Sequence, residues 1–297
     1  GAGKSTLLNA ITGRTTPTQG QILIGGRDLH KEYADLSQRI GLVPQADILH
    51  TRLTVRQALN YGAALRFPSE TSRAEREARV EEVMEKLELT PRADLRIDKL
   101  SGGQRKRASI GLELLTKPSI LVLDEPTSGL DPGLDAHVME TLRKLADEGQ
   151  TVVVVTHAVE NLSFCDNVIL MASGGRIAYF GPTSTIFNAF DKKSWSEVFK
   201  LLADNNATFL QSEKKPYIQS EQEKRAIKES AKRQSWIKQT FTLSSRYLSV
   251  IKSDRFYMLL LVIVPTVMGL ISYLTSSKWG FAPGPLNDAG FRYNPTA

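Results

Sequence analysis

One segment of this 297-residue chain constrains its fold more than any other: residues 120–126 read Ile-Leu-Val-Leu-Asp-Glu-Pro. An uninterrupted apolar run of this length is typical of a parallel strand that is buried on both faces. Such a strand would deliver Asp124 and Glu125 to its C-terminal edge. Strand and helix patterns alternate along much of the chain, which predicts an α/β fold built on a parallel sheet.

Further elements are expected on both sides of this strand. The pattern predicts a loop over 1–6 that leads into a helix ending at Gly13. Further helices are predicted over 73–89, from Ser101 to about Thr116, and from Pro132, with Asp131 as its cap. Strands are expected at 21–24, 39–43 and 151–156, the last of them buried, and a hairpin is expected between 168–171 and 176–179.

The chain begins Gly1-Ala2-Gly3-Lys4-Ser5-Thr6, which matches the second half of a phosphate-binding loop. Glycines let backbone N–H groups curl around a phosphate, and the N-terminus of the helix that follows favours negative charge. Lys4 is expected to reach the β- and γ-phosphates of a nucleotide, and Ser5 is expected to bind Mg²⁺. Six residues match by chance often, so this interpretation depends on the other motifs.

Three further positions fit the chemistry of phosphate hydrolysis. Asp124 is a candidate Mg²⁺ ligand and Glu125 a candidate acceptor for the proton of an attacking water; the alternative for the pair is a cap of the turn at Pro126. His157 follows the apolar run 152–155, where a strand of the same sheet should end, and is expected to contact the γ-phosphate or orient the attacking group. For Gln45, after a short strand, the sequence leaves open whether its amide contacts Mg²⁺ or the lytic water.

A second anion-binding turn is predicted where the sequence reads Leu-Ser-Gly-Gly-Gln. Ser101 can cap a helix, and Gly102 and Gly103, followed by Gln104, let the backbone approach an anion closely. Because the chain already has one phosphate cradle, this turn is most useful against a nucleotide that another copy holds. We therefore expect a head-to-tail dimer with two ATP molecules at its seam and Asp131 nearby. The basic run at 105–107 is interpreted as a solvated helix face, and no nucleic-acid partner is expected.

The C-terminal third carries the excess positive charge of a chain whose net charge is +6. Residues 191–235 lose hydrophobic periodicity, which predicts a charged linker, and 236–255 are expected to form an amphipathic connecting helix. Residues 256–277 contain no charge and would form a helix about 33 Å long, which is enough to cross a bilayer. Basic residues before this span place its N-terminal side in the cytoplasm, so 278–297 would begin an extracytoplasmic loop. A buried helix of a soluble protein is the alternative.

The single cysteine, Cys165, excludes an internal disulfide and suits a reducing compartment. Because Gly1 lies inside a phosphate loop, we expect the chain to be part of a longer protein.

Taken in order, these motifs resemble the ATP-binding domain of ABC transporters over roughly residues 1–180, and the domain is expected to span 1–190. The resemblance implies a P-loop fold with a parallel-sheet core and a helical subdomain, ATP and Mg²⁺ as ligands, and ATP hydrolysis. It also implies that residues 101–104 contact ATP bound by the opposite subunit. The first glycine of the phosphate loop and the aromatic residue that stacks on adenine have no counterpart in this sequence.

Residues 43–50, 53–56 and 176–182 resemble the G-type (white/pleiotropic drug resistance) branch and bacterial relatives that carry a forkhead-associated domain. This resemblance implies a half-transporter, an exporter of unknown substrate, with a cytoplasmic ATPase domain before a multi-pass domain in the cell membrane. A second half-transporter copy and the lipid bilayer would be its partners.

Two other functions remain open at this point. One is a soluble ABC-type ATPase that acts on DNA or the ribosome, against which the apolar span argues. The other is a regulatory binding protein in which nucleotide only gates the docking of a partner.

Overall fold

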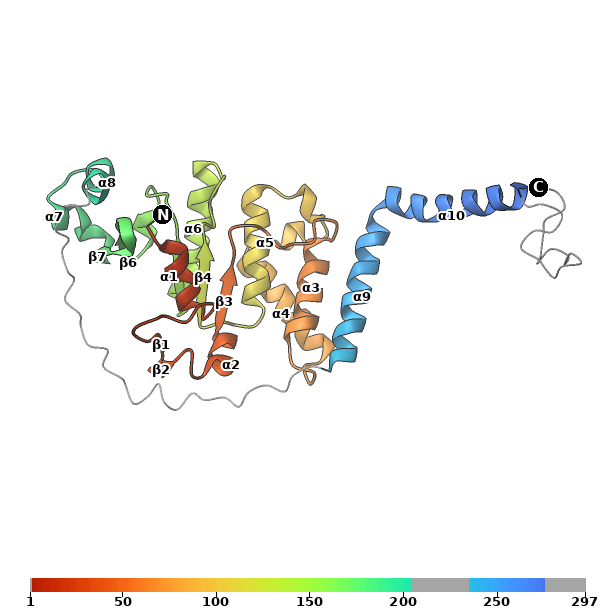
Figure 1. Ribbon diagram of the computed structural model, residues 1–297, viewed down its shortest axis with the longest axis horizontal. Coiled ribbons are helices and arrows are strands. Elements are labelled where there is room, and N and C mark those ends of the chain that lie inside the picture. Colours follow the sequence, from red (N-terminus) through yellow and green to blue (C-terminus); the bar gives the residue numbers. More distant parts are fainter. Residues whose placement is uncertain (1, 204–234, 276–297) are drawn as a thin grey trace, which may run out of the picture. The chain divides into compact units, whose positions relative to one another are not determined.

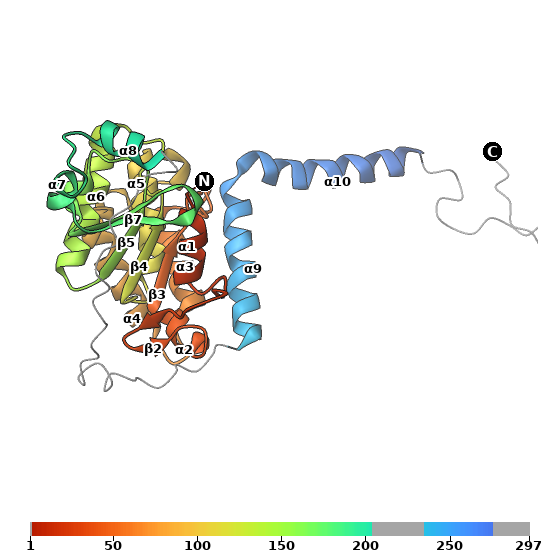
Figure 2. The same cartoon turned by 60° about the vertical axis from the view of Figure 1, so that its left-hand side comes forward.

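The computed structural model describes residues 2–203 and 235–275, and the chain forms two compact units, Gly1–Thr242 and Leu243–Ala297. The first unit contains a three-stranded parallel sheet in the order β3-β4-β5, formed by Ile40–Val43, Ile120–Asp124 and Thr151–Val155 (Figure 2). Leu42 pairs with Val122, which pairs in turn with Val153. The predicted α/β fold with a parallel sheet is confirmed.

The central strand β4 carries the core of this sheet, since Leu121, Val122 and Leu123 are almost fully buried. The prediction that β5 is buried is wrong, because its four valines are only half-buried. Within the described residues β5 is an edge strand with a neighbour on one side only, so its apolar composition does not produce burial.

Helices contact each strand of the sheet (Figure 1). Helix α1 (Lys4–Ile11) contacts β4, α5 (Gly102–Leu114) contacts β3, and α6 (Pro132–Asp147) contacts β5. The predicted start of α6 is confirmed: Asp131 Oδ1 accepts hydrogen bonds from the backbone N–H groups of Gly133 and Leu134, each at 3.1 Å.

A helical subdomain forms beside β3 from α3 (Val55–Arg66), α4 (Arg73–Lys86) and α5, which contact one another (Figure 1). Each helix begins with a capping box, in which a Ser or Thr and the residue three positions later cap each other's backbone N–H group. The predicted apolar stripe of α4 is confirmed, because Val80, Val83 and Met84 are fully buried.

Several short elements complete the first unit. Strands β1 (Leu23–Ile24) and β2 (Arg27–Asp28) form an antiparallel pair, and α2 (Tyr33–Leu36) leads towards β3. Single 3₁₀ turns occupy Ser37–Arg39, Thr90–Arg92, Ile97–Lys99, Leu162–Phe164, Ser173–Gly175 and Thr183–Thr185.

The predicted hairpin is present as β6 (Asn167–Met171) and β7 (Ile177–Pro182), which pair antiparallel. It packs with α7 (Ile186–Phe190) and α8 (Trp195–Ala203) around a second apolar cluster. Val198 and Leu202 of α8 are buried in this cluster, so the part of the predicted linker that the structure describes is folded. A prediction based on composition missed the short apolar stripe of α8 because charged residues surround it.

Helix α9 (Trp236–Ser253) crosses the boundary between the two units, and α10 (Arg255–Thr275) lies in the second. Helix α10 runs without interruption through Pro265, and the side chains of 256–274 are largely exposed. Residues 204–234 and 276–297 lie outside the described residues, and with them most of the predicted linker, the end of the predicted span and the predicted loop.

Candidate functional site

The predicted chemical residues gather at one edge of the parallel sheet. Gln45 follows the end of β3 after one residue, Glu125 follows the last residue of β4, and His157 lies two residues beyond β5. Because parallel strands all end at the same edge, three segments that are far apart in sequence meet there.

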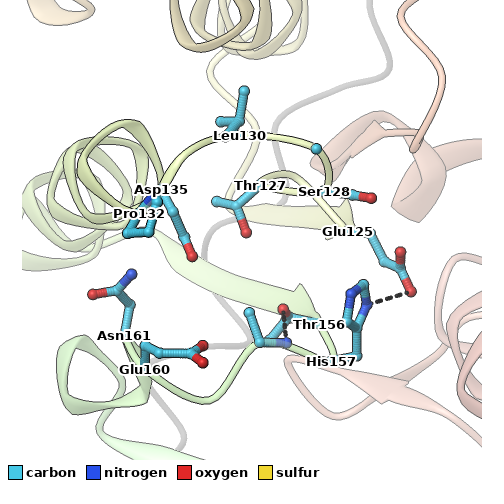
Figure 3. Close-up of a pocket in the computed structure, with 12 residues that line it drawn as sticks. Glu125, Thr127, Ser128, Leu130, Pro132, Asp135, Thr156, His157, Glu160 and Asn161 are labelled. Atoms are coloured by element: carbon cyan, nitrogen blue, oxygen red, sulfur yellow. Dashed lines mark hydrogen bonds and ion pairs between the residues drawn. The ribbon is translucent and has the colours of Figure 1, made fainter.

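Glu125 lies at the centre of this group and contacts both other side chains. Its Oε2 atom accepts a hydrogen bond from Nε2 of Gln45 at 3.2 Å, and its Oε1 atom lies 3.2 Å from Nδ1 of His157. The Glu125 side chain is 22% exposed and that of His157 is 64% exposed. Figure 3 shows the two side chains pointing towards each other, so the carboxylate is held on two sides and still reaches solvent.

The backbone at Glu125 is unusual, because its φ of 45° is in the left-handed region. A residue with a side chain adopts this region at a cost of order 1–3 kcal/mol, and such residues concentrate at active sites. The Glu125 N–H donates to the carbonyl of Val155 at 2.7 Å and so continues the ladder between β4 and β5. This hydrogen bond therefore fixes the backbone of Glu125. The left-handed conformation of the residue turns its carboxylate out of the line of the strand.

A tight turn places His157 beside this carboxylate. Thr156 Oγ1 accepts a hydrogen bond from the N–H of Ala158 at 3.0 Å, which reverses the chain directly after β5 (Figure 3). Glu125 and His157 line an open cavity of about 270 Å³, to which the segment before α6 and the start of α6 also contribute. A small anionic group or a water can reach both side chains from this cavity.

The phosphate-loop residues lie at the start of α1, which contacts β4. Ala2, Gly3 and Lys4 are half-buried, Ser5 and Thr6 are exposed, and Gly1 lies outside the described residues. Gly3 has a φ of 84°, and a Cβ there would lie 3.3 Å from Cα of Gly175. The positive φ therefore favours glycine at this position, and a Cβ would fit only with a small shift of the neighbouring backbone.

Hydroxyl and carboxylate oxygens suitable for a hard cation are supplied by two contacting elements. Ser5 is in the first turn of α1, and Asp124 is the last residue of β4. Oxygen ligands of this kind are those that Mg²⁺ prefers. The residue types at these two positions are therefore those expected for the predicted ion.

The second predicted anion-binding turn is at the start of α5, where Ser101 and Gly102 are exposed. Ser101 Oγ accepts a hydrogen bond from the N–H of Gln104 at 3.3 Å, and Gln104 Oε1 accepts one from the N–H of Ser101 at 3.1 Å. A Cβ at Gly102 would lie 2.7 Å from a methyl group of Leu130, and one at Gly103 would lie 3.3 Å from Leu134. The two glycines therefore let the residues around Asp131 pack closely against this turn.

The interpretation of the basic run as a solvated face is wrong. The side chains of Lys106 and Arg107 are only 8% and 9% exposed. Lys106 Nζ lies 3.0 Å from the carbonyl oxygen of Gln45, and Arg107 Nη1 lies 3.1 Å from that of Leu87. Both residues belong to the buried side of α5, with Gly103, Ile110 and Leu114.

The structure thus brings Gln45, Glu125 and His157 into contact, and it places residues 101–104 beside the segment that contains Asp131. Sequence reasoning missed Lys106, although a helical stripe drawn through Gly103 and Ile110 passes through it. It also missed Thr156, whose position directly after a strand is a common one for a turn-forming hydroxyl.

Three features define a nucleotide-binding α/β domain of the P-loop class. They are a helix that begins directly after Gly3, a parallel sheet, and the carboxylates of Asp124 and Glu125 at the sheet edge. The family model described as "ABC transporter" matches residues 1–128. A solved ATP-binding cassette, a dimer in a post-hydrolysis state with ADP and Pi bound, is 30% identical with a TM-score of 0.53. The match covers 61% of this chain and 81% of that chain. The chain belongs to the ABC transporter family, as an ATP-binding cassette, and its fold is that of the ABC ATPases.

Similar curated proteins identify the branch. An ABC transporter ATP-binding/permease protein of Mycobacterium tuberculosis is 45% identical over 294 residues, which cover 97% of this chain and 34% of that protein. ABC transporter G family member 28 of Arabidopsis thaliana is 39% identical over 199 residues, which cover 64% of this chain and 18% of that protein. The chain spans about a third or less of the length of these relatives. The resemblance to the G-type branch and its bacterial relatives is confirmed.

Proposed function

We propose that this chain is the ATP-hydrolysing part of an ABC-type membrane exporter in which two copies of the ATPase domain close head to tail around two ATP molecules. The observation that carries this proposal is the contact of Glu125 with both Gln45 and His157 at the edge of the sheet. A carboxylate held between an amide and an imidazole, and open to a cavity, is suited to orient a water and accept its proton.

Each remaining site residue has a role that its position supports. Lys4 and the backbone N–H groups at Gly1, Ala2, Gly3 and Thr6 would hold the phosphates. Ser5, Asp124 and the amide of Gln45 would hold Mg²⁺, which neutralises charge on the β- and γ-phosphates when bound. His157 would orient the γ-phosphate or the water from the opposite side of Glu125.

The dimer is supported by the exposed turn at the start of α5. Ser101 and Gly102 are exposed, and the helix behind them is long enough for its N-terminus to attract an anion. We propose that residues 101–104 close over the ATP held by the partner, with Asp131 near the seam. The similar ATP-binding cassette that was solved as a dimer after hydrolysis supports the same assembly.

The membrane role is supported by α9 and α10. Residues Phe256–Leu274 form a helix with a mean hydropathy of 2.1, long and apolar enough to cross a membrane. The Mycobacterium tuberculosis relative is named as an ATP-binding/permease protein, which joins both activities in one chain. We propose a multi-pass protein of the cell membrane with its ATPase domain in the cytoplasm, and α9 as the helix that connects the two.

The test is the substitution Glu125→Gln in the full-length protein in membrane vesicles. We expect ATP affinity to be retained and ATP turnover to fall about 100-fold or more, because an amide cannot accept the proton. The variant should also accumulate as an ATP-bound dimer. Wild-type protein without ATP turnover, or a Glu125→Gln variant with unchanged turnover, would contradict the proposed function.

A further inference from the structure

Lys106 on α5 is a buried cation whose ammonium group points away from its own helix. Its side chain is 8% exposed, and its Nζ atom lies 3.0 Å from the carbonyl oxygen of Gln45 and 3.4 Å from that of Pro44. The third neighbour is Oδ1 of Asp47, at 3.3 Å. Three acceptors therefore match the three N–H donors of the ammonium group, and the carboxylate compensates its charge.

These contacts join two parts of the proposed site that are separate in sequence. Lys106 is five positions after Ser101, on the same helix, and it holds the backbone of Gln45. The side chain of Gln45 in turn donates to Glu125. A continuous set of bonds thus runs from the helix that begins at residues 101–104 to the carboxylate at the sheet edge.

We propose that Lys106 is a positioning residue that couples the turn at residues 101–104 to the hydrolytic carboxylate. The inference rests on the function proposed above. A shift of the N-terminus of α5 against a nucleotide would displace Lys106 on the same helix, and Lys106 would carry the backbone of Gln45 with it through their hydrogen bond. The amide of Gln45 then holds Glu125 in place only when α5 is correctly seated. In this proposal Lys106 acts through the backbone of Gln45.

The test is a double-mutant cycle on ATP turnover by the full-length protein in vesicles. Lys106→Met keeps the length of the side chain and removes its charge. We expect it to lower kcat about tenfold and to change KM for ATP less than about twofold, because nucleotide binding does not involve it. In a variant that also carries Gln45→Ala, kcat should be no lower than with Gln45→Ala alone, because both changes break the same set of bonds.

Arg107→Met is the matched control on the same helix. Arg107 is as buried as Lys106, but it bonds the carbonyl oxygen of Leu87 and the carboxylate of Glu88 instead of residues near Gln45. We expect it to lower Tm while kcat stays within about twofold of wild type. If Lys106→Met does not fold, Asp47→Asn replaces it, and the loss of the ion pair should lower kcat about two- to threefold with little change in Tm.

The outcomes separate the two proposals. If the Lys106 and Gln45 effects on kcat multiply, or if Lys106→Met and Arg107→Met lower kcat in proportion to their losses of Tm, Lys106 is only structural and the inference is wrong. Failure of the Lys106 inference would leave the proposed function intact, provided that wild-type protein turns over ATP and Glu125→Gln abolishes that turnover. Absence of turnover in the wild-type protein would overturn both.

Discussion

Gln45 and Glu125 are 80 positions apart, yet Nε2 of Gln45 donates a hydrogen bond to Oε2 of Glu125 at 3.2 Å. The bond joins the segment that follows β3 to the residue that follows β4. The segment after β3 leads into the helical subdomain, and β4 lies in the centre of the sheet. The carboxylate is therefore oriented by a side chain whose position depends on where the helical subdomain lies.

Removal of this amide should slow ATP turnover. We expect Gln45→Ala to lower kcat about tenfold, because a hydrogen bond to a charged group contributes about 1.5–3 kcal/mol. Gln45→Glu should have the larger effect, since it places a second carboxylate next to Glu125. Gln38→Ala is the control: this exposed amide bonds only the carbonyl of Ala34 among the described residues, and turnover should not change. A Gln45→Glu variant as active as wild type would show that the pair does not matter for hydrolysis.

The turn at residues 101–104 can be tested against a second capping box in the same subdomain. Ser72 caps α4 as Ser101 caps α5, with a serine oxygen that accepts from the backbone N–H group three positions later. Ser72→Arg and Ser101→Arg should each lower Tm, because each loses a cap worth about 1 kcal/mol. Only Ser101→Arg should lower ATP turnover, by about 100-fold, since the new side chain would fill the space of the partner's nucleotide.

Binding measurements complete this comparison. ATP affinity should be similar in both variants and in wild type, because the phosphate loop of each copy is unchanged. Equal turnover in Ser101→Arg and Ser72→Arg would contradict the proposed seam.

Gly3 and Gly149 allow the conformational and the binding roles of glycine to be separated. Both have a positive φ, 84° and 97°, and a Cβ at Gly149 would meet no atom within 4 Å. Alanine at either position should lower stability by about 1–2 kcal/mol through backbone strain. Only Gly3→Ala should also weaken ATP binding, because its backbone belongs to the phosphate loop; isothermal titration and thermal melts measure the two effects. Unaltered ATP affinity in Gly3→Ala would argue against that loop.

If α10 spans the bilayer, the free-energy cost of placing an arginine in this helix should depend on the depth of the arginine in the membrane. An arginine at Val264, in the middle of α10, should weaken membrane insertion by about 2.5–3.5 kcal/mol, whereas one at Phe256, at its start, should cost far less. Resistance to carbonate extraction and insertion into microsomes measure the difference. Equal insertion of Val264→Arg and Phe256→Arg would show that α10 does not cross the bilayer.

Local signals in the sequence predicted much of the fold. The apolar run of β4, the Asp131-Pro132 start of α6 and the glycines between β6 and β7 each specify their structure within a few residues. Helix α3 was missed because two of its four buried residues, Ala58 and Ala63, are small and weaken its apolar stripe. Its capping box of Thr54 and Gln57 was the available signal.

The site was harder to predict where it depends on the path of a loop. Strand ends placed Glu125 and His157 on one edge, because parallel strands end together. The contact of Gln45 could not be derived, since nothing local determines how the chain runs after Pro44. The burial of Lys106 was missed for a related reason. A count of charges does not reveal that carbonyl oxygens of a distant loop accept hydrogen bonds from its ammonium group.

A low pH should remove the ion pairs of Glu88, which connect the end of α4 to α6. Glu88, just after α4, lies 3.1 Å from Arg107, 3.2 Å from His137 and 3.7 Å from Lys144. Burial would raise the pKa of Glu88, but the charges of His137, Arg107 and Lys144 outweigh it and hold that pKa below its ordinary value. The folded state therefore favours the carboxylate. Its stabilisation is complete above the unfolded pKa of about 4.3 and is lost as the pH falls through the lower folded pKa.

We expect Glu88→Gln to lower stability at pH 7 by less than about 1 kcal/mol, because the side chain is half exposed and solvent screens the pairs. The difference in Tm between wild type and this variant should shrink as the pH falls below about 4.3. Glu85→Gln, at an exposed position on α4, is the matched control and should leave Tm unchanged at every pH. A Glu88→Gln difference that grows with acid would mean that Glu88 is held in its protonated form, and that the three cations do not stabilise its charge.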